Sequence, residues 1–144
     1  MNIVSLSTAK KAVVASVVPI LILTILEFPP PIGFETRPQS DVSPVWLVFF
    51  IAILAVEIAV IPLIYRRPKL GAELSVLAAV LNIIQVIADQ AHLMQPEVAP
   101  LGYSLLEGMV VIASVALASF SWVVLKSWQR LSPPVSTKRN IIPA

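Results

Sequence analysis

Residues 45–65 read VWLVFFIAILAVEIAVIPLIY, and Glu57 is the one charged side chain in this run. At about 1.5 Å of rise per residue, a helix of about 20 residues crosses the ~30 Å hydrocarbon layer of a bilayer. Transmembrane β-strands alternate apolar and polar side chains, whereas residues 51–56 are apolar throughout. The run therefore predicts a transmembrane α-helix.

Three further apolar stretches complete the pattern, at roughly residues 12–28, 73–94 and 102–126. Together the four stretches predict an all-α, integral membrane four-helix bundle over residues 1–131, followed by a flexible basic tail over residues 132–144. The first stretch is the shortest and contains Pro19, which predicts a bend or an incomplete span there.

The composition favours a single small membrane domain. Of the 144 residues, 58% are apolar and 12% are charged, whereas soluble domains are about 45–50% apolar. A soluble domain this small is mostly surface, and so little charge would leave that surface prone to association. Cysteine is absent, so the chain itself offers no disulfide, thiolate metal site or dithiol.

The basic residues predict the orientation. Nine of the ten fall on one side of the predicted helices: Lys10, Lys11, Arg66, Arg67, Lys69, Lys126, Arg130, Lys138 and Arg139. The positive-inside rule makes this side cytoplasmic and places both termini there, in a multi-pass protein of the cell membrane. Topology thus explains the basic residues without a nucleic-acid partner. A cleaved signal peptide is not favoured, because no small-residue cleavage site follows the first stretch.

One face of the third predicted helix is polar. Its members are Asn82, Gln85, Asp89 and His92, spaced 3, 4 and 3 residues apart. At helical periodicity these side chains fall within an arc of about 80°. Lipid is a costly neighbour for such a face, so the sequence predicts that it lines the interior of the bundle.

The other helices contain polar residues that could meet this face, while Glu27 and Glu97 are expected at the membrane interface. We predict an outward-opening polar pocket with two groups of candidate residues. The acid–base candidates are Glu57, Asp89, His92 and Glu107, and the ligand-binding candidates are Asn82, Gln85, Thr24 and Ser114. The alternative for the amides and hydroxyls is that they form hydrogen bonds between helices.

Carboxyl groups beside a histidine can relay protons, bind a quinone carbonyl or hold a cation. The single histidine excludes haem with two axial histidines, and no serine lies in a nucleophile motif. Four glycines supply no phosphate-binding loop. The residues therefore assign no metal ligands and identify no cofactor.

The second and third stretches resemble the DoxX-like family of small four-helix membrane proteins. The resemblance covers about 50 residues: an acidic residue within a helix (Glu57), a basic turn (RRPKLGA, 66–72) and a helix ending in ADQAHL (88–93). It implies an association with respiratory or thiol-redox membrane complexes, some of them coupled to the quinone pool.

Three functions remain open from the sequence. The first is a redox-complex accessory protein that binds a quinone-like lipid or relays protons. The second is a membrane enzyme that performs acid–base chemistry on a lipophilic substrate, as an isomerase, cyclase or hydrolase. The third is a structural subunit whose polar faces meet a membrane protein partner or a second copy of the chain.

Overall fold

The computed structural model describes residues 5–28, 31, 33, 35–37, 44–94 and 96–131. This part of the chain is all-α, with four helices and no strand: α1 (Leu6–Leu26), α2 (Pro44–Arg66), α3 (Pro68–Gln90) and α4 (Leu101–Leu131). All four are long and apolar enough to cross a membrane. The predicted tail, with Lys138 and Arg139, lies outside the described residues.

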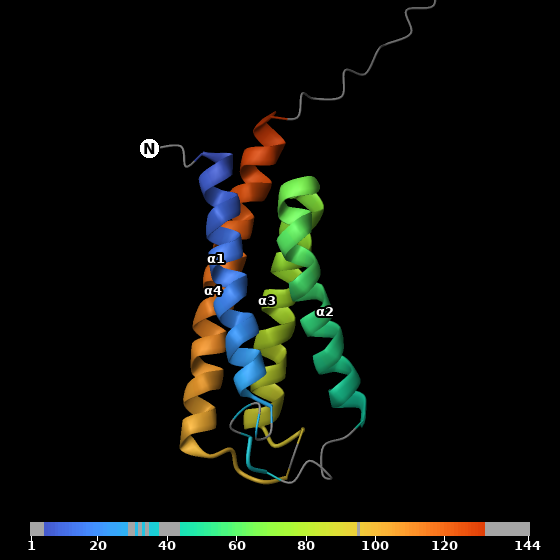
Figure 1. Ribbon diagram of the computed structural model, residues 1–144, viewed down its shortest axis with the longest axis vertical. Coiled ribbons are helices and arrows are strands. Elements are labelled where there is room, and N and C mark those ends of the chain that lie inside the picture. The colour runs from blue at the N-terminus through green and yellow to red at the C-terminus, as the bar shows by residue number, and fades with distance from the viewer. Residues whose placement is uncertain are drawn as a thin grey trace, which may run out of the picture.

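The helices form an antiparallel bundle (Figure 1). Each packs against its neighbours in the order α1, α2, α3, α4 and back to α1, with little contact across the diagonal. The start of α1, the α2–α3 turn and the end of α4 share one end of the bundle. Seven of the eight described basic residues belong to these segments, and we call this the basic end: Lys10, Lys11, Arg66, Arg67, Lys69, Lys126 and Arg130.

The first helix begins earlier than predicted and continues through Pro19. It starts at Leu6, after Ser5, whose side chain accepts a hydrogen bond from the Thr8 backbone N–H at 3.2 Å. This N-cap satisfies one of the free donors of the first turn. Pro19 lies inside a helix that continues to Leu26, and this helix is long and apolar enough to cross a membrane.

The basic turn is also shorter than predicted. Only Arg67 separates α2 from α3, because Pro68 occupies the first turn of α3. Proline is well suited to this position, since its fixed φ is helical and its missing N–H would have had no partner. The third helix therefore begins five residues before the predicted start at Glu73.

At its other end α3 stops at Gln90 rather than continuing to Met94. The His92 N–H donates to the Asp89 carbonyl and the Leu93 N–H to the Ala88 carbonyl, each at 2.9 Å. His92 adopts φ 57°, and this pattern is the Schellman C-cap. His92 thus lies in the helix-terminating turn, and the prediction that it continues the polar face of the helix is wrong.

The core follows a 3–4 spacing of buried residues. In α4 they are Glu107, Val110, Ser114, Leu117, Ser121 and Val124. This alternation is the pattern of helices that pack along a shared seam. Several buried residues of α3 are small, including Gly71, Ala72, Ser75 and Ala79, which lets neighbouring backbones approach closely.

The outside of the bundle is apolar. Large hydrophobic side chains are exposed along all four helices, with Val45 at 74% and Ile112 at 73%. Soluble monomers rarely expose apolar surface on this scale, whereas a lipid-facing surface is stable when apolar. The distribution agrees with four membrane-spanning helices.

Candidate polar site inside the bundle

The centre of the site is a buried carboxyl group on α2. Glu57 is 0% exposed and occupies the stripe otherwise formed by Ile53, Val60 and Ile64. Its Oε1 accepts a hydrogen bond from Nδ2 of Asn82 on α3 at 2.5 Å. Glu57 is therefore joined to the polar face of α3 through Asn82.

Several other interior polar atoms have no protein partner within the described part of the chain. They are Oε2 of Glu57, Oε1 of Gln85 and the hydroxyls of Ser114 and Ser121. Buried polar groups are costly unless they are hydrogen-bonded, and ordered water or a ligand can supply the missing bonds. The middle of the bundle thus retains hydrogen-bonding capacity that its own side chains do not use.

A second cluster lies nearer the end of the bundle opposite the basic end. Asp89 of α3 is 4% exposed and Arg37 of the α1–α2 loop is 6% exposed. Nη1 of Arg37 donates a hydrogen bond to Oδ1 of Asp89 at 3.1 Å, and Nη2 donates one to Oδ2 at 2.9 Å. Nη2 of the same guanidinium also donates a hydrogen bond to Oε2 of Glu35 at 2.6 Å. One buried cation therefore joins two buried carboxylates.

Hydrogen bonds within the α1–α2 loop hold Arg37 next to Asp89. The Glu35 N–H donates to the Phe28 carbonyl at 3.1 Å, which folds the loop back over the end of α1. The Arg37 N–H then donates to Oε1 of Glu35 at 2.8 Å. From α4, the ring of Tyr103 lies 4.6 Å from the guanidinium carbon, a cation–π contact.

The charge of Arg37 is permanent in this setting. Burial alone lowers the pKa of Arg37, but its hydrogen bonds to Glu35 and Asp89 outweigh that effect and raise the pKa above its usual value. Arg37 and Glu35 thus lie beside Asp89, at the position where the sequence predicts an opening.

Two further carboxyl groups complete this cluster. Glu107 of α4 is 3% exposed and accepts a hydrogen bond from Nε2 of Gln90. The same nitrogen also lies 3.2 Å from the Ser104 hydroxyl. Glu27, just past α1, is 7% exposed, and its Oε1 has no partner among the described residues. Glu27 thus faces the interior at the end of α1, whereas Glu97 is exposed.

The structure brings most of the predicted site residues to the interior. Glu57, Asn82, Gln85, Asp89, Glu107, Thr24 and Ser114 are all buried. His92 is exposed and does not join them. Four residues of the site were not predicted from the sequence: Arg37, Glu35, Gln90 and Tyr103. One signal was available for Arg37: it is the single basic residue on the side of the helices that carries most of the acidic ones.

Glu27 provides a test of this environment through pH. Burial, and then the negative charges of Glu107, Asp89, Glu57 and Glu35, raises the pKa of Glu27 from 4.5 to about 8. Between these two values the folded protein keeps a proton that the unfolded chain loses. The free energy of unfolding should therefore fall as pH rises through this window, by up to about 1.4 kcal/mol per pH unit.

Glu27→Gln should reduce this slope and make the protein more stable than the wild type at pH 9, with little difference at pH 4. The measurement is denaturant unfolding in mild detergent across that range. Glu97→Gln, at an exposed position, is the matched control and should keep the slope. An unchanged slope in Glu27→Gln would contradict the assignment.

Comparison with known proteins adds no assignment: no family model, curated protein or solved structure matches the chain. The resemblance of the second and third helices to DoxX-like proteins stays a prediction.

Proposed function

We propose that this is a multi-pass membrane protein, with its basic end and both termini in the cytoplasm, which relays protons through its buried carboxyl and hydroxyl groups. The observation that carries the proposal is Glu57, which is fully buried and, among the described residues, hydrogen-bonded to the side chain of Asn82 alone. No cation pairs with it among the described residues. Ionisable side chains inside a membrane are costly and by default mark proton or ligand pathways.

The arrangement of polar side chains supports a path on the outer side of Glu57. Asn82, Gln85 and Asp89 are all buried on one face of α3, and Asn82 to Asp89 spans about 10.5 Å along the helix. Beyond Asp89, the Gln90 amide connects to Glu107 and Ser104. Water molecules bonded to the unpartnered Gln85 and Glu57 oxygens would bridge the gaps between these groups.

On the inner side, buried hydroxyls continue toward the basic end. Ser114 and Ser121 are 0% exposed, and neither hydroxyl has a hydrogen-bond partner within the described residues. They lie seven residues apart on α4, about 10.5 Å along the axis. Such hydroxyls can both donate to and accept from water, which suits proton transfer along a chain of hydrogen bonds.

A second candidate function is the binding of a quinone-like lipid, as the DoxX resemblance implies. It is favoured by the unpartnered atoms at mid-bundle, Oε2 of Glu57 and Oε1 of Gln85. A protonated Glu57 could donate to a quinone carbonyl, while the Gln85 oxygen could accept from a quinol hydroxyl. In this case the ligand, rather than water, would complete the hydrogen bonds.

The test is proton flux into liposomes that contain the protein and a pH-sensitive dye. The wild type should increase flux over protein-free liposomes, and Glu57→Gln should abolish the increase, because glutamine accepts the Asn82 hydrogen bond but cannot exchange a proton. Glu73→Gln, on the exposed surface of α3, is the matched control and should retain flux. Equal flux in wild type and Glu57→Gln would overturn the relay. A flux that needs added quinone would favour the second function.

A further inference from the structure

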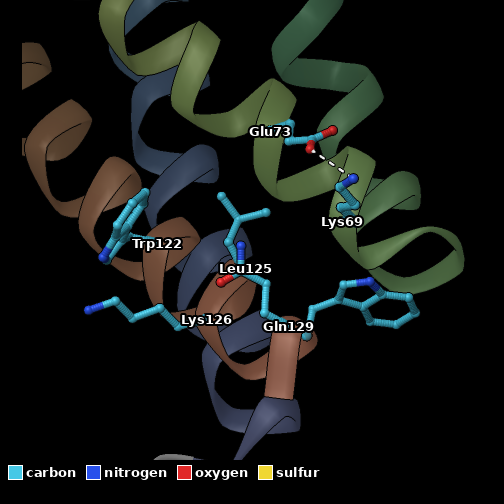
Figure 2. Close-up of a pocket in the computed structure, with 7 residues that line it drawn as sticks. Lys69, Glu73, Trp122, Leu125, Lys126 and Gln129 are labelled. Atoms are coloured by element: carbon cyan, nitrogen blue, oxygen red, sulfur yellow. Dashed lines mark ion pairs between the residues drawn. The ribbon is translucent and has the colours of Figure 1, made fainter. Parts of the chain in front are cut away.

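A cavity with a different chemistry lies at the basic end, between the start of α3 and the end of α4 (Figure 2). Its volume is about 160 Å³, and it is lined by Lys69 and Glu73 of α3 and by Trp122, Leu125, Lys126, Trp128 and Gln129 of α4. None of these residues belongs to the carboxyl site. We propose that this cavity binds the headgroup of an anionic phospholipid.

The lining contains two lysines whose ammonium groups can donate hydrogen bonds to a ligand. The Lys126 ammonium lies 5.6 Å from the centre of the Trp122 ring and has no acidic partner among the described residues. Lys69 lies 3.7 Å from a carboxylate oxygen of Glu73, with side chains 64% and 48% exposed. A pair this open to solvent is weak, so Lys69 can also contact a phosphate. Ammonium groups and the Gln129 amide are suitable donors to phosphate oxygens.

The charge balance selects an anionic lipid. The lining holds two lysines against one glutamate, and Arg66, Arg67 and Arg130 lie at the same end of the bundle. The phosphate of an anionic lipid retains its full charge toward these groups, whereas a zwitterionic headgroup also brings its own ammonium near them. Basic pockets between transmembrane helices on the cytoplasmic side are typical sites for such headgroups.

The surface next to the cavity suits the acyl chains of the same lipid. Leu77 lies one turn from Glu73 toward the middle of α3 and is 46% exposed, while Val115 of α4 is 54% exposed. Trp122, at the cavity itself, is 57% exposed. Tryptophan beside lysine at the end of a helix is the pattern found at the headgroup level of a bilayer. The cavity therefore joins a polar headgroup site to an apolar face.

The experiment measures quenching of tryptophan fluorescence by brominated lipids in detergent. Trp46→Phe removes the tryptophan at the other end of the bundle, so the signal reports Trp122 and Trp128. Brominated phosphatidylglycerol should quench at lower concentration than brominated phosphatidylcholine. Lys69→Gln/Lys126→Gln should weaken the phosphatidylglycerol effect by about fivefold per lysine removed.

Lys10→Gln/Lys11→Gln removes the same charge from the same end without touching the cavity, and it should keep the wild-type preference. Equal quenching by the two lipids would overturn the proposal. So would an equal loss of the preference for phosphatidylglycerol in the cavity double variant and in the Lys10→Gln/Lys11→Gln control. Displacement of brominated phosphatidylglycerol by inorganic phosphate would also overturn it, because the site would then bind a free ion. This proposal shares only membrane insertion with the proton relay. A protein that fails to carry protons but still prefers phosphatidylglycerol would contradict the proton relay and leave the lipid site standing.

Discussion

Arg37→Ala is expected to destabilise the protein by about 3–5 kcal/mol, because it would leave two buried carboxylates without their cation. Arg37 donates to both Asp89 and Glu35, and all three side chains are 6% exposed or less. The substitution also removes the contact with Tyr103. The measurement is the free energy of unfolding in mixed micelles, followed by the loss of helical circular dichroism.

Two further variants provide a control and an intermediate case for Arg37→Ala. Arg66→Ala removes an arginine at the exposed end of α2 and should change stability by less than about 0.5 kcal/mol. Arg37→Lys keeps the charge but cannot form the paired contact with Asp89, so it should fall between the wild type and Arg37→Ala. If Arg37→Ala were as stable as Arg66→Ala, the buried ion cluster would not contribute to the fold.

Gly71→Ala should also cost stability, by about 1–3 kcal/mol, because α2 and α3 touch backbone to backbone at this residue. A Cβ atom at position 71 would lie 2.5 Å from the backbone nitrogen of Ile64 and 2.6 Å from its Cα. Backbone cannot move aside as a flexible side chain can, so the two helices would have to separate. The loss is measured as a lower melting temperature in detergent.

Gly108→Ala is the matched control on α4. A Cβ atom there would meet nothing within 4 Å, and alanine favours a helix interior over glycine by up to about 1 kcal/mol. This variant should therefore be as stable as the wild type or more so. Equal behaviour of the Gly71 and Gly108 variants would contradict the close contact between α2 and α3.

The sequence predicted the helices well because their signal is local. A continuous apolar run such as residues 45–65 can satisfy its backbone only as a helix in an apolar setting. The buried polar residues of α3 were predicted by helical periodicity, which places Asn82 and Asp89 on one face. The ends of α3 were not predicted well, because Pro68 and His92 act through local backbone geometry that hydropathy does not describe.

The sequence by itself thus determined the four apolar helices, the alternating direction of successive helices and the polar face of α3. Only the tertiary structure decided which partners that face has. Asp89 and Arg37 are separated by 52 residues, and their pairing depends on the loop folding back through the Glu35–Phe28 hydrogen bond. Helical periodicity specifies which side of a helix is buried. It does not specify which loop side chain will occupy the space next to that side, because that choice depends on contacts between segments that are distant in the chain.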